Sequence, residues 1–299
     1  MNFIGEIAAI VTAICWSFTS IFFTISGSRI GSVAVNRLRL LLALAFLLLA
    51  HLLTTGQFLP LTAGRERWFW LGISGFVGFV LGDGMLFQAL VVVGTRITML
   101  IMSLVPVIGT LLAWIFLGEK LSAIEILAIS IVVGGITLVV ADKQADYAAA
   151  NKKHLLLGLL LAMGGAAGQA VGLILSKKGM AGDFPALSAN VIRVSIAATI
   201  SWLLTILIGK IKYTFSKLAD KKALWTVLGG AAFGPFIGVW MSLVAIKYAK
   251  IGIASTLMAL PPILVLPLVH YIFKEKISPR AITGTIITVA GIALLFLAT

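Results

Sequence analysis

Long apolar runs recur along this chain of 299 residues, and short segments rich in charged and turn-forming residues separate them. A run of about 20 apolar residues can cross a bilayer as an α-helix, because the hydrocarbon core is about 30 Å thick and the helix rises about 1.5 Å per residue. Hydrophobic residues make up 61% of the chain and charged residues 11%, which is too little polar surface for a water-soluble globule. The sequence therefore predicts an all-α protein that crosses a membrane several times.

The interruptions between the apolar runs divide the chain into ten expected spans. Most connections between these spans are very short, so consecutive spans should pack as antiparallel neighbours. The expected spans are residues 4–25, 32–54, 68–92, 97–117, 123–140, 155–175, 186–208, 224–246, 252–273 and 280–298.

The formal net charge of +13 comes from lysines and arginines in the connections, with few aromatic residues beside them and no basic domain. This distribution suits lipid phosphates better than nucleic acid, so we expect membrane lipids, and no nucleic acid, as partners. Cys15 is the only cysteine, which excludes a disulfide framework and a cysteine-rich metal site. The sequence also lacks nucleotide-binding and hydrolase motifs. We therefore expect no enzymatic activity, cofactor or metal.

One phrase occurs twice, because residues 104–122 read LVPVIGTLLAWIFLGEKLS and residues 260–278, 156 positions later, read LPPILVLPLVHYIFKEKIS. The alignment extends without a gap over residues 65–141 and 221–297. Equivalent pairs in it include Gly78 and Gly234, Gly82 and Gly238, Met85 and Met241, and Pro106 and Pro262.

The repeat reaches further upstream, where Asn36-x-x-Arg39 falls on Asn190-x-x-Arg193 with a shift of 154. Each half then holds five expected spans, and an odd number forces the second half to enter the membrane from the opposite side. A site between two inverted halves can open to either face in turn, which is alternating access. Duplication without transport is the other interpretation. The expected domains are a first repeat at residues 1–141, a polar linker at 142–154 and a second, inverted repeat at 155–299.

These features resemble the EamA-type family of the drug/metabolite transporter superfamily. Each half in that family carries a long span ending in a Gly-Glu-x-Leu-Ser-like turn, which this chain matches from Ala89 to Ser122 and, less closely, from Ala245 to Ser278. The first span departs from the family's common Trp-Gly-Ser-Asn-Phe by reading Trp-Ser-Phe-Thr-Ser from Trp16. The resemblance implies ten spans around a central cavity and a solute that is an amino acid, another metabolite, a nucleotide sugar or a drug.

Asp83 lies near the middle of the third expected span. A carboxylate at that depth costs about 2.5–3.5 kcal/mol on insertion scales, so it should face the bundle interior, pair with a cation or take up a proton. One interpretation is a site for proton coupling or for a substrate amine, and the other is a structural partner for Arg39. The equivalent position in the second half is Val239, so any such chemistry differs between the halves.

Three further charges and several helix-bending residues lie inside or at the ends of spans. The resemblance relates Arg39, Arg193 and Lys177 to charges found in the family, and we expect them to be gating or structural charges. Glycines recur every fourth residue from Gly164 to Gly172, a spacing that lets another backbone approach closely. Prolines remove backbone donors and bend membrane helices. The hinge candidates are Pro106, Pro235, Pro261 and Pro262.

The expected cavity combines aromatic and methionine surfaces with a few polar groups, which suits a small amphipathic solute. Ordinary packing is the alternative for each methionine and tryptophan. The residues expected to line the cavity are Trp16, Ser20, Asp83, Gln88, Met99, Ser103, Gln169, Trp240, Ser255 and Met258.

Together these features favour a secondary transporter that exports small metabolites such as amino acids, with proton coupling at Asp83 as one mechanism. A passive facilitator or exchanger and a membrane-embedded enzyme acting on lipid are the alternatives. We expect a monomer or weak homodimer in the cell's plasma or inner membrane. The resemblance puts both termini in the cytoplasm, whereas the five lysines of residues 209–223 favour the reverse orientation by the positive-inside rule.

Overall fold

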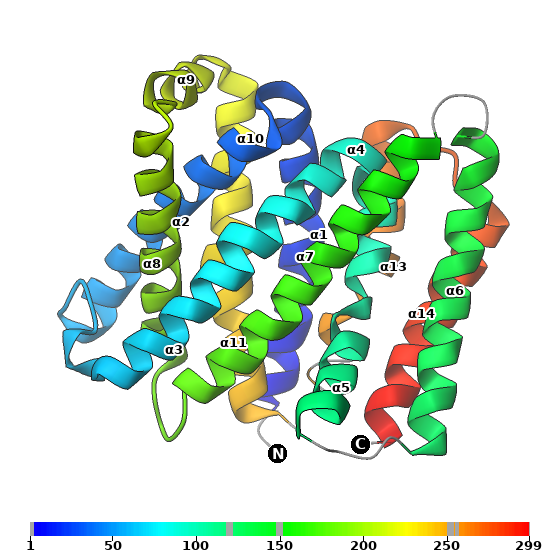
Figure 1. Ribbon diagram of the computed structural model, residues 1–299, viewed down its shortest axis with the longest axis horizontal. Helices are drawn as coiled ribbons and strands as arrows, with labels where there is room; N and C mark the ends of the chain where they lie inside the picture. The colour runs from blue at the N-terminus through cyan, green and yellow to red at the C-terminus, as the bar shows by residue number, and fades with distance from the viewer. Residues whose placement is uncertain (1–2, 118–121, 148–151, 250–253, 255–256, 299) are drawn as a thin grey trace.

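The computed structural model describes residues 3–117, 122–147, 152–249, 254 and 257–298, and these residues form a helical bundle without a strand (Figure 1). The all-α class expected from the apolar runs is therefore confirmed. The elements are α1 (Ile4–Ile30), α2 (Ser32–Thr55), η1 (Leu61–Ala63), α3 (Arg65–Gly75), η2 (Phe76–Gly82), α4 (Asp83–Met102), α5 (Leu104–Leu117), α6 (Ala123–Tyr147), α7 (Lys152–Gly179), α8 (Ala186–Leu207), α9 (Ile211–Ser216), η3 (Lys217–Ala219), α10 (Lys221–Ala231), η4 (Ala232–Gly238), α11 (Val239–Tyr248), α13 (Pro261–Phe273) and α14 (Pro279–Ala298).

Several of these helices are long and apolar enough to cross a membrane, which confirms the expected multi-pass class; the count of ten spans stays a prediction. Shorter apolar helices occupy Ala123–Val139, Pro261–Phe273 and Pro279–Leu294. Among the described residues, the six long candidates are Ile4–Ile30, Ser32–Thr55, Arg65–Met102, Lys152–Gly179, Ala186–Leu207 and Lys221–Tyr248.

The longest of these segments is interrupted at Gly94, where φ is 77° and ψ is 172°. Glycine adopts such a positive φ without the strain that a side chain would bring. The interruption falls between residues 92 and 97, where the sequence predicts the connection from the third to the fourth span. The segment from Arg65 to Met102 therefore consists of two helical parts that meet at Gly94.

The outer surface of the bundle carries large apolar side chains. Leu53, Leu207 and Leu297 are 76%, 80% and 84% exposed, as hydrocarbon-facing residues are in membrane helices. The interior holds charged side chains instead, among them Arg39 and Asp83. This distribution is what a bilayer requires, because the membrane solvates apolar groups and leaves ionised groups to find partners inside the protein.

Helices of one half pack mainly against helices of the other half. α1 packs along α10, η4 and α11, and α7 packs along α3, η2 and α4. In addition, α2 packs on α8, and α6 packs on α14. Figure 1 shows α1 running away from the end of the bundle where α14 finishes, while α7 runs toward that end. The first helix of each half, α1 or α7, thus packs on the third expected span of the other half. This pattern fits two inverted repeats.

Two π-helical segments occupy equivalent places in the repeat. η2 precedes Asp83 in the first half, and η4 lies 156 positions later in the second. A π-turn widens the helix and disturbs the regular hydrogen bonding of its backbone, which is why such turns often occur at functional sites. The sequence gives no sign of these segments beyond Gly78, Gly82 and their equivalents, which lie within them.

Glycines bring α7 against the first of these π-helical segments. A Cβ atom added to Gly168 would lie 2.6 Å from the Cα atom of Gly82, and one added to Gly172 would lie 3.3 Å from the Cα atom of Gly78. The two backbones therefore approach too closely for larger residues at Gly168. Because of this close packing, Gln169, the neighbour of Gly168, lies within hydrogen-bond distance of Asp83.

Candidate functional site

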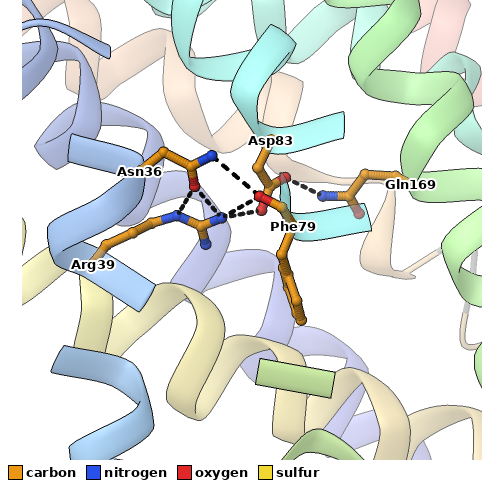
Figure 2. Close-up of polar contacts among 5 residues, drawn as sticks. All are labelled: Asn36, Arg39, Phe79, Asp83 and Gln169. Atoms are coloured by element: carbon orange, nitrogen blue, oxygen red, sulfur yellow. Dashed lines mark hydrogen bonds and ion pairs between the residues drawn. The ribbon is translucent and has the colours of Figure 1, made fainter. Parts of the chain in front are cut away.

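A buried ion pair links α2 to the start of α4. Asp83 is 4% exposed, and its Oδ2 atom accepts a hydrogen bond of 2.6 Å from Nη2 of Arg39 (Figure 2). Its Oδ1 atom accepts a bond of 3.1 Å from Nε2 of Gln169 on α7. The carboxylate is thus held between a cation from its own half of the chain and an amide from the other half.

Arg39 has several partners besides Asp83. Its Nε and Nη2 atoms donate to Oδ1 of Asn36 at 3.0 and 2.9 Å, and Nη2 also donates to the backbone oxygen of Phe79 at 3.3 Å (Figure 2). The guanidinium carbon lies 4.6 Å from the ring centroid of Phe87 and 5.6 Å from that of Phe79. Aromatic faces attract cations, most strongly where water is excluded. Arg39 therefore sits in a cage of neutral groups that stabilises its charge independently of the carboxylate.

The cage includes a backbone carbonyl of the π-helical segment η2. Its carbonyl at Phe79 accepts hydrogen bonds from both Asn36 Nδ2, at 3.2 Å, and Arg39. In the second half, Asn190 Nδ2 donates in the same way to the carbonyl of Pro235 in η4, at 2.8 Å. An asparagine that bonds to a π-helical carbonyl is therefore a feature of both halves.

The repeat equivalent of Arg39, Arg193, is also buried and has neutral partners. Arg193 is 4% exposed, and its Nε atom donates to Oγ of Ser74 at 3.0 Å. Its guanidinium carbon lies 4.7 Å from the ring centroid of Phe79, the same ring that Arg39 contacts. Val239 stands where the second half would carry an equivalent of Asp83. The cluster formed by the described residues thus holds two arginines and a single carboxylate.

Of the predicted cavity residues that the structure describes, Gln169 is the one hydrogen-bonded to Asp83. Met99 is buried in a cluster with Ile21, and Met258 is buried in another cluster at the start of α1. Both methionines therefore pack as ordinary core residues in this conformation.

The other predicted cavity residues are spread over the bundle. Ser20 is buried and donates to the carbonyl of Ser17 at 2.7 Å, while Gln88 accepts from Ser32 at the junction of α1 and α2. Ser255 lies outside the described residues. Buried Ser103 follows α4, and partly buried Trp16 and Trp240 lie on α1 and α11. Their assignment to a cavity stays a prediction.

The remaining candidates have local roles that the structure makes visible. Lys177 is exposed in the last turn of α7. Pro235 lies inside η4, whereas Pro106, Pro261 and Pro262 lie in the first turns of α5 and α13. A proline in a first turn interrupts little helical hydrogen bonding, so Pro235 is the hinge candidate that lies within a continuous helical segment.

Sequence reasoning missed several residues of the cluster. Asn36, Phe79, Phe87 and Ser74 were not among the expected site residues, although they contact Arg39 or Arg193 directly. The repeated Asn-x-x-Arg pattern was the available signal, because a buried asparagine beside an arginine must satisfy its amide and can do so with that arginine. The aromatic residues left no comparable pattern.

Comparison with known proteins decides the family. The sequence profile of the EamA-like transporter family matches residues 3–141 and, separately, 156–297. The chain belongs to the EamA-like transporter family. The resemblance stated from the sequence is confirmed, and this EamA-like protein is a multi-pass membrane transporter of the drug/metabolite transporter superfamily.

A solved crystal structure supports the fold of this EamA-like transporter. It is 17% identical in sequence, aligns over 100% of this chain and 98% of its own, and gives a TM-score of 0.67. At that identity the likeness concerns the fold alone. No curated protein sequence matches this one.

Proposed function

We propose that this EamA-like transporter is a secondary active exporter of small metabolites such as amino acids, and that proton binding at Asp83 couples transport to a pH gradient. The observation that carries the proposal is the buried Asp83, which is bonded to Arg39 in the first half and to Gln169 in the second. A group that bonds to both halves can respond when the halves move relative to each other.

The cage around Arg39 allows Asp83 to change its charge. Arginine stays protonated in proteins, so a proton that neutralises Asp83 would normally leave an uncompensated buried cation. Here Asn36 Oδ1, the carbonyl of Phe79 and the aromatic faces stay beside the guanidinium. The cost of protonating Asp83 is thereby reduced, and Asp83 can release Arg39 without exposing it to hydrocarbon.

Arg193 supplies a second partner for the same carboxylate. It occupies the repeat position of Arg39, and in this conformation its guanidinium group lies over the same Phe79 ring as that of Arg39. Alternating access exchanges the arrangements of two inverted halves, so the opposite state brings Asp83 closer to Arg193 and away from Arg39. In this mechanism protonation of Asp83 permits the exchange, and deprotonation locks either end state.

The proposed location is the plasma or inner membrane, with both termini in the cytoplasm as the family resemblance implies. The lysine-rich segment at α9 and η3 then lies on the opposite side, because it is at the other end of the bundle from the last turn of α14 (Figure 1). Labelling a cysteine introduced at Lys212 in intact cells with a membrane-impermeant reagent tests this orientation.

The proposal is tested by transport into proteoliposomes. Purified protein is assayed with a panel of labelled amino acids and small metabolites, with and without an imposed pH gradient. Asp83→Asn removes the titratable group, and Asp183→Asn makes the same chemical change at a side chain that is 96% exposed.

The expected result is accumulation that needs the gradient, survives in Asp183→Asn and is lost in Asp83→Asn. Native flux that is the same with and without the gradient, or accumulation that persists in Asp83→Asn, would contradict proton coupling; the first of these results would favour a facilitator or exchanger. Failure to move any solute, with the protein folded, would reopen the embedded-enzyme interpretation.

A further inference from the structure

A groove of about 460 Å³ lies at one end of the bundle, apart from the buried charge cluster. It runs between the junction of α1 and α2, one side of α4 and the segment that joins α8 to α9. Its polar lining comes from Ser32, Arg37, Gln88, Lys210 and Tyr213. The chain turns at Gly31, where φ is 85°, so this end of the bundle is where two helices leave the bilayer. The groove is therefore at the boundary between hydrocarbon and water.

Arg37 is a buried cation without an acidic partner. It is 8% exposed, and its Nη1 atom donates to Oγ1 of Thr214 at 3.1 Å. No carboxylate of the described residues forms an ion pair with it. A guanidinium has five N–H donors, and Thr214 accepts from one of them. Arg37 thus brings positive charge and further donor capacity to the wall of the groove.

Lysines on either side of the short helix α9 add more positive charge near the groove. Lys210 is exposed at the groove, and its Nζ atom lies 5.9 Å from the ring centroid of Tyr213. Lys217 approaches the same ring, with Nζ at 4.7 Å from the centroid. Tyrosine and lysine beside each other are typical of the headgroup region of a bilayer, where the ring is apolar on one side and its hydroxyl reaches water.

Exposed apolar side chains also line the groove. Val33 and Ile208, which line it, are 59% and 55% exposed. A soluble anion would use the cations and gain nothing from these residues. A ligand with both a negative headgroup and acyl chains would use both, because cations bind phosphate oxygens through charge-assisted hydrogen bonds and exposed apolar side chains pack against hydrocarbon.

We propose that this groove binds an anionic phospholipid, with its phosphate on Arg37 and Lys210 and its acyl chains over Val33 and Ile208. Bound there, the lipid joins the α1–α2 junction to the segment after α8, and so links the two halves at the membrane surface. The proposal concerns binding alone and stands whether or not Asp83 couples transport to protons.

The test compares lipids that differ in headgroup charge. Purified protein in a neutral detergent is titrated with dioctanoyl phosphatidylglycerol, with dioctanoyl phosphatidylcholine and with inorganic phosphate. Native mass spectrometry counts the bound lipids, and thermal unfolding follows stabilisation. The variants are Lys210→Gln, which changes an exposed side chain, and Arg37→Gln. Lys222→Gln is the matched control, because it removes the same charge from an exposed position that does not line the groove.

Phosphatidylglycerol should bind and raise the unfolding temperature, and Lys210→Gln should weaken this binding about fivefold while Lys222→Gln leaves it unchanged. Arg37→Gln should weaken it at least as much. Equal binding of the two lipids, or equal losses in Lys210→Gln and Lys222→Gln, would overturn the proposal in favour of unspecific attraction. Stabilisation by inorganic phosphate as strong as that by phosphatidylglycerol would overturn it in favour of a free-anion site.

Discussion

Asn36 and Asn190 occupy equivalent positions but make different numbers of contacts. Asn36 accepts two hydrogen bonds from Arg39 and donates one to the carbonyl of Phe79. Asn190 donates one bond to the carbonyl of Pro235, and its buried Oδ1 atom has no partner among the described residues. Asn36 therefore fixes Arg39 with two hydrogen bonds in the first half, while Oδ1 of Asn190 in the second half accepts none from the described residues. Such a difference is expected if the halves exchange arrangements during transport.

These two asparagines can be compared by substitution. Asn36→Ala should lower the free energy of unfolding by about 1–3 kcal/mol, because it leaves the buried Nε donor of Arg39 without its acceptor. Asn190→Ala should lower the free energy of unfolding by less, because it removes only one hydrogen bond and also removes a buried oxygen that has no partner among the described residues. Unfolding of both variants in the same detergent measures the difference, and an equal or larger loss in Asn190→Ala would be evidence against the asymmetry.

The sequence identified Asp83 and Arg39 as interior charges but left open whether they meet. Their contact depends on the rotation of α2 and η2 about their axes, and helices that are apolar on most sides encode that rotation weakly. The aromatic cage was hidden for the same reason, because Phe87 resembles every other phenylalanine of an apolar run. The interior position of these charges was predictable, because a charged side chain deep in a membrane span must face the inside of the protein or find a partner there.

At the scale of helices, glycine positions determine how closely elements approach. α6 and α14 pack along their lengths, and Gly135 faces this interface, where an added Cβ atom would lie 2.7 Å from the backbone oxygen of Gly284. At the neighbouring Gly134 an added Cβ atom meets nothing within 4 Å. The apolar runs predicted the helices themselves, and the repeated glycines indicated flat faces. The π-helical segments were not predictable, because their residues also suit an ordinary α-helix.

The adjacent glycines offer a matched pair of variants. Gly135→Ala should destabilise the protein by roughly 1–3 kcal/mol, because the added methyl group forces the backbones of α6 and α14 apart. Gly134→Ala should be neutral or stabilising by up to about 1 kcal/mol, as alanine is the better helix former. Thermal unfolding compares the two, and similar effects would contradict the packing described here.

The start of α10 predicts a pH dependence. Asp220 caps this helix by accepting a 3.0 Å bond from the backbone N–H of Ala223, and it pairs with Arg29 of α1 at 2.8 Å. The Ala223 bond and the Arg29 bond lower the pKa of Asp220 below its ordinary value of 3.8. A lowered pKa in the folded state means that the stabilisation is complete above the unfolded-state pKa and is lost as the pH falls through the folded-state value.

Asp220→Ala should therefore lower the unfolding temperature at neutral pH, and the difference from the native protein should shrink as the pH falls below about 3.8. Thermal unfolding between pH 7 and pH 3 measures this difference. A difference that stays constant over that range would show that the carboxylate charge does not contribute.

At the scale of the whole molecule, each half covers part of the other. α1 lies on α10 and α11, and α7 lies on α3 and α4, so neither half has a complete interior of its own. The repeat predicted two related halves, because the same phrase occurs 156 positions apart. The repeat did not predict which helix of one half packs on which helix of the other. The pattern of apolar residues in the sequence is the same whichever helices are paired.

The central claim is that Asp83 must lose and regain a proton for net transport, and one comparison tests it directly. Asn in place of Asp83 resembles the protonated carboxyl and cannot release a proton. In proteoliposomes, Asp83→Asn should still exchange labelled for unlabelled solute across the membrane, which also shows that it is folded, but should no longer accumulate solute in response to a pH gradient. Asp183→Asn should do both. Accumulation by Asp83→Asn at the native rate would contradict the account.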